Sequence, residues 1–208
     1  MSNFPLILRS DKMPCGALLL VDYIPSYEAL LAAADDADRA SIAGFSSPSR
    51  CRERLAWREL LRRELRMPVA VSYLPSGRPL LQGSAFQYIS VSHCADMVAV
   101  VLSDARCGVD VERLDRRFAA VAERYISDEE LSLVHSDYER AVIWAAKECL
   151  YKMTHCEGLD LKEHIRIEAI DGATSLVRGV VRHHDKELLR CELHLLQPDT
   201  EHILLYAF

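Results

Sequence analysis

Gly108-Val109-Asp110-Val111-Glu112 alternates apolar residues with two acids, which is the pattern of a β-strand. Because side chains alternate across a strand, we expect Asp110 and Glu112 on one face and the two valines on the other. Two like charges held at short range need a cation or a proton beside them. The stretch therefore predicts a strand with one buried apolar face and one acidic face that binds a cation.

A second stretch, from Trp144 to Lys152, predicts a helix on which Trp144, Glu148 and Lys152 follow one another along one side. Taken alone, Glu148 and Lys152 could be an ordinary pair one turn apart, worth roughly 0.2–0.5 kcal/mol. The segment 141–146 is apolar on several sides, however, so the helix should be buried, where charges need further partners. Lys147 projects roughly 100° away from Glu148 and is kept as a further candidate.

Together the two stretches predict a magnesium site. The carboxylates of Asp110, Glu112 and Glu148 supply the hard oxygen ligands that Mg²⁺ prefers, with Mn²⁺ as an alternative metal. Lys152 follows one turn beyond the helical acid, where its ammonium group can hold a phosphate oxygen that the metal also contacts. This combination indicates diphosphate chemistry.

The pattern along the chain predicts an α+β fold. Half of the 208 residues are hydrophobic, enough for one large domain or two small ones. In the first half we expect a short helix at 26–34, a long helix that Ser47 and Pro48 begin and that stops before Pro68, and strands at 16–22, 69–73, 86–92 and 97–103, of which the last two form an antiparallel pair joined at 93–96. In the second half we expect the acidic strand at 107–112, a short helix opened by a capping box at 127–130, a helix at 137–152, and an antiparallel meander of strands at 164–170, 175–181, 188–196 and 202–206. Each half, 1–104 and 105–208, then has helices packed on a small antiparallel sheet.

The two motifs in this order resemble those of the 4′-phosphopantetheinyl transferase superfamily, in its longer, Sfp-like branch. The signature is GVDVE followed by WxxKExxxK, and weaker matches occur in the family's order between about Arg50 and Lys152. These are Arg58 before a Leu-Leu pair, Ser76-Gly77-Arg78-Pro79 in the place of a Gly-Lys-Pro loop, Ser92-His93 at a strand end, and the segment 123–130. Arginine replaces the family's lysine at Arg78, which keeps the charge and changes the geometry.

The resemblance implies a pseudo-dimer of two similar halves with the active site between them. It also implies transfer of 4′-phosphopantetheine from coenzyme A to a serine of an apo acyl or peptidyl carrier protein, with release of adenosine 3′,5′-bisphosphate. In that reaction Asp110, Glu112 and Glu148 would hold Mg²⁺, Glu148 would act as the base, and Lys152 would neutralise the diphosphate. Further coenzyme A contacts would come from the first half, with Arg58 and His93 on the 3′-phosphate and Gly77, Arg78, Pro79 and Ser92 lining the nucleotide site.

Two other functions share part of this pattern. A metal-dependent nuclease also combines carboxylates with a lysine, but its acids and lysine usually lie on adjacent strands, and the net charge of −6 disfavours a nucleic-acid partner. A relative that binds coenzyme A or a carrier without catalysis is the closer alternative. The intact set of Asp110, Glu112, Glu148 and Lys152 argues against it.

The remaining expectations concern partners and location. Carrier proteins are acidic around their serine, so the cluster that follows the acidic strand is the candidate docking patch: Arg113, Arg116, Arg117 and Arg124. Seven cysteines without a CxxC pair indicate a reducing compartment, and no apolar run reaches membrane-spanning length. We expect a cytoplasmic monomer that takes part in fatty-acid, polyketide or nonribosomal-peptide biosynthesis.

Overall fold

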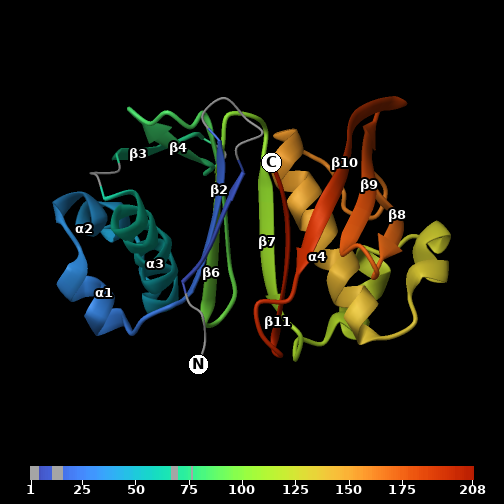
Figure 1. Cartoon of the computed structure of the whole chain (residues 1–208), viewed down its shortest axis with the longest axis horizontal. Helices are drawn as coiled ribbons and strands as arrows, with labels where there is room; N and C mark the ends of the chain where they lie inside the picture. The colour runs from blue at the N-terminus through green and yellow to red at the C-terminus, as the bar shows by residue number, and fades with distance from the viewer. Residues whose placement is uncertain (1–4, 11–15, 67–69, 76) are drawn as a thin grey trace. The chain divides into compact units, whose positions relative to one another are not determined.

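The computed structural model describes residues 5–10, 16–66, 70–75 and 77–208. Val69 of the predicted strand and Ser76 of the predicted loop lie outside these ranges. The chain divides into two compact units, Met1–Ala105 and Arg106–Phe208, which Figure 1 colours from blue to green and from green to red. Each unit combines helices with an antiparallel sheet, which confirms the α+β class.

The sheet of the first unit has the strand order β1-β2-β6-β5. Its strands are β1 (Leu6–Ser10), β2 (Ala17–Tyr23), β5 (Tyr88–His93) and β6 (Met97–Ser103), and all neighbours are antiparallel. The predicted hairpin of β5 and β6 is confirmed, with Ser92 opposite Ala99. Every residue of β6 is buried, as expected for an unbroken apolar run in a central strand.

Three helices cover one face of this sheet, as Figure 1 shows. They are α1 (Tyr27–Ala33), α2 (Asp36–Ile42) and α3 (Pro48–Leu65). Helix α3 begins where the sequence predicts, because the Ser47 side chain caps it and Pro48 fills its first turn. Its apolar face, including Leu55 and Leu61, packs against β2 and β6. A two-stranded sheet of β3 (Ala70–Tyr73) and β4 (Pro79–Gln82) completes the unit.

The second unit is a five-stranded sheet of order β7-β11-β10-β9-β8 with helix α4 (Asp137–Thr154) across it. The strands are β7 (Gly108–Arg113), β8 (Ile165–Asp171), β9 (Leu176–His183), β10 (Lys186–Leu196) and β11 (His202–Ala207). The last four form the predicted meander, and β7 pairs with β11 at its edge. The core between α4 and the sheet contains Ile143, Leu150, Ile203 and Leu205.

Two 3₁₀ segments precede α4: η1 (Phe118–Arg124) and η2 (Asp128–Leu133). The capping box predicted at Ser127 and Glu130 is present, but the segment it opens is a six-residue 3₁₀ helix. The carboxylate of Glu130 is fully buried and also bonds outside its own segment, to α4 and β8. Among the described residues, no helix has both the length and the apolarity needed to cross a membrane.

Candidate functional site

The acidic strand presents its carboxylates to α4. Asp110 and Glu112 lie opposite Leu205 and Ile203 of β11, and directly opposed residues share a face of the sheet. Both β11 residues belong to the core beneath α4, so the two acids face the same helix. The alternation predicted for this strand is therefore present.

Gly108 allows α4 to approach this strand closely. A Cβ atom at this position would lie 2.5 Å from the backbone oxygen of Cys149 and 2.7 Å from Cγ of Met153. Real Cβ atoms do not come that close to a backbone oxygen, so only glycine fits here without moving the helix. The glycine that opens the GVDVE motif thus brings the acidic face within reach of the helical side chains.

Two residues of α4 bond directly to the two acids. The Lys152 ammonium donates to Asp110 Oδ1 at 2.7 Å and to the Val109 carbonyl oxygen at 3.0 Å. Two turns earlier, Trp144 Nε1 donates to Glu112 Oε1 at 2.6 Å. The predicted side of α4 is therefore the one that lies along β7.

Glu148 lies between Trp144 and Lys152 on this side of the helix, and both its burial and the charge of Asp110 on the strand affect its pKa. Burial raises the pKa of Glu148, and the charge of Asp110 raises it further, against the opposing effect of Lys152. Burial and Asp110 likewise raise the pKa of Glu112, which Arg116 and Trp144 counteract. Burial lowers the pKa of Lys152, but the neighbouring acids outweigh this and raise it. The three acids form one repulsive cluster that cations stabilise.

The donor set fits a hard divalent cation. Three carboxylates from two facing elements provide oxygen ligands of the kind that Mg²⁺ takes, and no soft ligand competes among them. Their oxygens do not all lie within 4.8 Å of one another in the described structure. Lys152 bonds Asp110 instead, and an arginine bonds Glu112. A bound metal would therefore have to draw the carboxylates together against these internal cations.

That arginine is Arg116, one of the four predicted for carrier docking. Its Nη1 donates to Glu112 Oε1 at 2.6 Å, and its guanidinium lies 4.5 Å from the Trp144 ring centroid. Arg113 is also engaged, with Asp115 and Glu201. Arg117 and Arg124 are exposed, and the part of the chain that the structure describes gives neither an ion pair. The docking candidates therefore divide into two engaged and two solvent-facing arginines.

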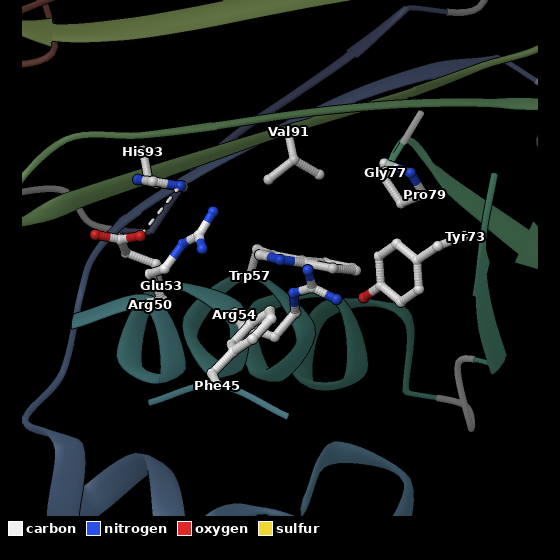
Figure 2. A pocket seen from close by; sticks show the side chains of 10 residues that line it. All are labelled: Phe45, Arg50, Glu53, Arg54, Trp57, Tyr73, Gly77, Pro79, Val91 and His93. Atoms are coloured by element: carbon white, nitrogen blue, oxygen red, sulfur yellow. Dashed lines mark ion pairs between the residues drawn. The ribbon is translucent and has the colours of Figure 1, made fainter. Parts of the chain in front are cut away.

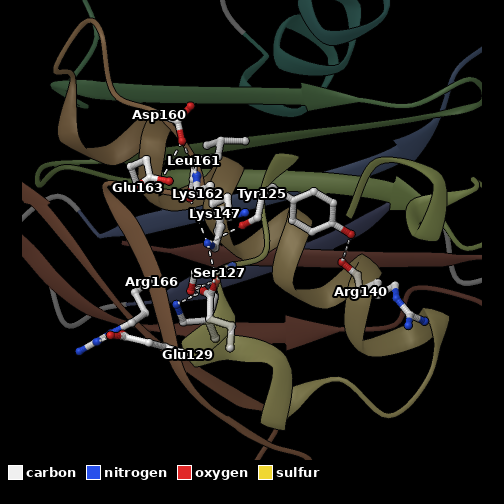
Figure 3. Close-up of polar contacts among 12 residues, drawn as sticks. Tyr125, Ser127, Glu129, Arg140, Lys147, Asp160, Leu161, Lys162, Glu163 and Arg166 are labelled. Carbon is white, nitrogen blue, oxygen red and sulfur yellow. Dashed lines mark hydrogen bonds and ion pairs between the residues drawn. The ribbon is translucent and has the colours of Figure 1, made fainter. Parts of the chain in front are cut away.

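Lys147 lies away from the acidic cluster and is fully buried. Its ammonium donates to Glu130 Oε2 at 2.7 Å, to the Tyr125 carbonyl oxygen at 2.6 Å and to the Leu161 carbonyl oxygen at 3.0 Å. Figure 3 shows this convergence of η1, η2, α4 and the chain before β8. With three acceptors, the ammonium has used its three donors. These contacts give Lys147 a structural role, and it is a poor candidate for contact with a substrate.

A cavity of about 230 Å³ in the first unit contains three of the six residues of this unit that were predicted to bind coenzyme A, as Figure 2 shows. These three are Gly77, Pro79 and His93, and the cavity is also lined by Phe45, Arg50, Glu53, Arg54, Trp57, Tyr73 and Val91. The Arg54 guanidinium lies 4.2 Å from the Tyr73 ring centroid and 4.9 Å from that of Phe45. His93 Nε2 lies 3.5 Å from Glu53 Oε2. Arginines and a histidine can bind phosphate groups, and aromatic rings can stack on a base.

Arg58 lies outside the lining of this cavity. Its Nε donates to Asp38 Oδ1 at 2.6 Å, its side chain is 5% exposed, and Arg62 binds the same carboxylate. Burial opposes ionisation of Asp38, but the two arginines outweigh it and lower the pKa of Asp38. Arg58 thus ties α3 to α2. Arg78, whose guanidinium lies 5.9 Å from the Tyr88 ring centroid, and buried Ser92 are also absent from the lining.

Comparisons with known proteins agree with this chemistry. Residues 106–206 match the family model of the 4′-phosphopantetheinyl transferase superfamily. The 4′-phosphopantetheinyl transferase psf-1 of Bacillus pumilus is 31% identical over 85 residues, which cover 38% of this chain and 36% of that relative. The second unit is therefore similar to this superfamily, which confirms the resemblance stated from the motifs. The matched part spans little more than a third of the Bacillus protein's length.

Sequence reasoning missed several of these residues. Arg54 and Arg50 precede Arg58 by about one and two helical turns, so helical spacing alone could have placed all three on related faces of α3. The aromatic partners of Arg54 come from separate segments, and no local pattern joins Phe45 to Tyr73. Arg116 and Glu112 are four residues apart, a spacing that predicts contact in a helix. Because Glu112 lies in a predicted strand, this spacing did not indicate their contact.

The buried pair of Lys147 and Glu130 generates a stability prediction. Lys147→Met should lower the free energy of unfolding by about 3–5 kcal/mol, because it leaves the Glu130 carboxylate buried without its cation. The double variant Lys147→Met/Glu130→Gln should recover part of the loss, because it removes the buried charge and keeps an acceptor for Ile167 N. Lys186→Met, at an exposed position, should change stability by less than about 0.5 kcal/mol. Urea denaturation followed by circular dichroism measures all three. Near-normal stability of Lys147→Met would refute the structural role.

Proposed function

We propose that this protein transfers the 4′-phosphopantetheine group of coenzyme A to a serine hydroxyl of an apo carrier protein. The observation that carries the proposal is the shared face of β7 and α4, where three carboxylates and Lys152 meet in the unit that matches the superfamily. The Bacillus relative bears the name of this activity. Mg²⁺, held by Asp110, Glu112 and Glu148, would neutralise the diphosphate and polarise the phosphorus under attack.

In this proposal, residues of the second unit have different roles in the transfer. The serine oxygen attacks the phosphorus that bears pantetheine, and the bond from that phosphorus to the bridging oxygen of adenosine 3′,5′-bisphosphate breaks. Glu148 accepts the serine proton, and its raised pKa suits a base that works near neutral pH. Lys152 stabilises the negative charge that grows on the leaving diphosphate oxygen. Positioning and charge neutralisation dominate such transfers.

The cavity of the first unit supplies the nucleotide contacts in this proposal. Arg54, held between two aromatic rings, and Arg50 carry the charges for the 3′-phosphate, together with His93. Arg54 takes the role that we expected for Arg58, because the Arg58 guanidinium is already paired with Asp38. Gly77 and Pro79 line the same cavity.

Partner, location and oligomeric state remain parts of the proposal. The carrier is expected to be acidic around its serine, from fatty-acid, polyketide or nonribosomal-peptide synthesis. A cytoplasmic location agrees with the reduced thiols of the described cysteines, Cys51, Cys94, Cys107, Cys149, Cys156 and Cys191. A monomer is proposed because the resemblance implies that one chain holds both halves of the family fold.

The direct test incubates the protein with coenzyme A, Mg²⁺ and a panel of apo carriers and measures the intact mass of each carrier. One carrier or more should gain the mass of one phosphopantetheine, and none should gain it when Mg²⁺ is removed by a chelator. Binding of coenzyme A without any mass gain across the panel would instead support the non-catalytic alternative.

Removal of the acidic cluster should abolish transfer and leave the fold intact. Asp110→Asn and Glu148→Gln each remove one proposed metal ligand, so each should lower kcat on the order of 10²-fold or more. Glu123→Gln, at an exposed position of η1, is the matched control and should retain normal turnover. Initial rates of carrier modification at saturating substrate measure the effect. Wild-type turnover in either variant would remove that carboxylate from the mechanism.

The nucleotide cavity generates a substrate-specific prediction. Arg54→Gln should raise the KM for coenzyme A on the order of tenfold, because a charge-assisted contact to the 3′-phosphate is lost. The KM for 3′-dephospho-coenzyme A, which lacks that phosphate, should change little in the same variant. Arg63→Gln, at an arginine that pairs with Asp22 and Glu59, is the control. Equal losses with both substrates would place Arg54 away from the 3′-phosphate.

Carrier docking is predicted for the two solvent-facing arginines. The double variant Arg117→Glu/Arg124→Glu should raise the KM for the carrier and flatten its dependence on salt, because charges at an interface rim govern encounter. The KM for coenzyme A should not change. Arg178→Glu/Lys186→Glu, at exposed positions of β9 and β10, changes the net charge by the same amount and is the control. If the control and the double variant behave alike, the effect is one of overall charge and not of docking.

A further inference from the structure

Arg116 is placed where it acts on the metal site itself. Its Nη1 donates to Glu112 Oε1 at 2.6 Å, and Trp144 Nε1 donates to the same oxygen, also at 2.6 Å. The Glu112 side chain is 13% exposed and that of Arg116 is 42% exposed. A largely buried carboxylate is thus paired with a cation that remains in contact with solvent.

Aromatic rings keep this guanidinium in place. Its central carbon lies 4.5 Å from the Trp144 ring centroid and 5.2 Å from that of fully buried Phe118. Contacts between a guanidinium and an aromatic ring are attractive even at exposed sites. They give Arg116 a position near the acids that does not depend on its bond to Glu112.

The charges of the cluster show what the contact does. Three carboxylates face two internal cations, since Lys152 bonds Asp110 while Arg116 bonds Glu112. Arg116 also opposes the rise in the pKa values of Glu112 and Glu148. A divalent cation that binds the same acids competes with a charge already present.

We propose that Arg116 is an exchangeable counter-cation of Glu112, which neutralises this acid in the metal-free protein and gives way when a divalent metal binds. The inference deepens the proposed function, because it rests on the metal site assigned there. It makes Arg116 a positioning residue that weakens binding of the free metal. Its exposed side chain can leave the carboxylate while the aromatic contacts hold it nearby.

The test measures metal binding directly, without substrate or turnover. Mn²⁺ is titrated into wild-type protein and into Arg116→Gln, and the free ion is followed by electron paramagnetic resonance. Arg116→Gln should bind Mn²⁺ on the order of tenfold more tightly, the effect of about 1.4 kcal/mol. Arg117→Gln, at the neighbouring exposed arginine, should bind as wild type does. Unchanged or weaker binding in Arg116→Gln overturns the proposal, and weaker binding would mean that Arg116 orients Glu112 for the metal.

A second background shows whether the effect passes through the contact. In Glu112→Gln protein, which has no carboxylate for Arg116 to neutralise, adding Arg116→Gln should leave the Mn²⁺ affinity nearly unchanged. A full tightening in that background would assign the effect to the general field of the arginine and overturn the proposal. Equal melting temperatures of the two metal-saturated proteins would show that each is folded.

Tryptophan fluorescence gives an independent signature. In a Trp57→Phe background Trp144 is the sole tryptophan, and Mg²⁺ should shift its emission because the guanidinium changes its position over the ring when it releases Glu112. The shift should be absent when Arg116→Gln is added, and its persistence there would overturn the proposal. If wild-type protein binds no Mn²⁺ at all, the metal site of the proposed function fails together with this inference. Normal Mn²⁺ binding without a tighter Arg116→Gln variant refutes this inference alone.

Discussion

Repulsion among three buried or half-buried carboxylates is the constraint on which the second unit depends. Asp110 and Glu112 share a strand face, and Glu148 approaches them from α4. Burial raises the pKa of both glutamates, and the charge of Asp110 raises it further. The helix that brings the third acid also brings Lys152 to Asp110 and Trp144 to Glu112. Gly108 makes this approach possible because it has no side chain to hold the helix away. A protein that folds with these three carboxylates close together has a site that favours binding of a cation.

The rest of the unit keeps α4 in register with β7. Lys147 faces away from the acids and joins α4 to η2 and to the chain before β8, where Glu130 and backbone oxygens satisfy its charge. Adjacent residues of one helix thus serve different purposes: Lys147 fixes the helix, and Glu148 faces the strand. In the first unit a buried acid also joins two elements through ion pairs. Asp38 of α2 binds Arg58 and Arg62 of α3.

Periodicity made most of the fold predictable. The cap at Ser47, the hairpin of β5 and β6 and the C-terminal meander follow local rules of capping and alternation, and they appear where expected. Short or weakly patterned elements were not predicted from the sequence. Strands β1 and β4 have only five and four residues, and α2 is a polar, Asp-rich segment. The contacts between side chains were harder to predict than the helices and strands. Arg58, Arg54 and Arg116 all look like surface arginines in the sequence, and only the fold shows which of them meets an acid, an aromatic cage or both.

The central claim is that Asp110, Glu112 and Glu148 together hold a divalent metal. Diffraction from crystals soaked in Mn²⁺, collected to record its anomalous signal, tests this most directly. The account predicts one strong anomalous peak within coordination distance of oxygens from all three carboxylates, with Arg116 turned away from Glu112. A peak elsewhere, or none at a saturating Mn²⁺ concentration, would contradict it.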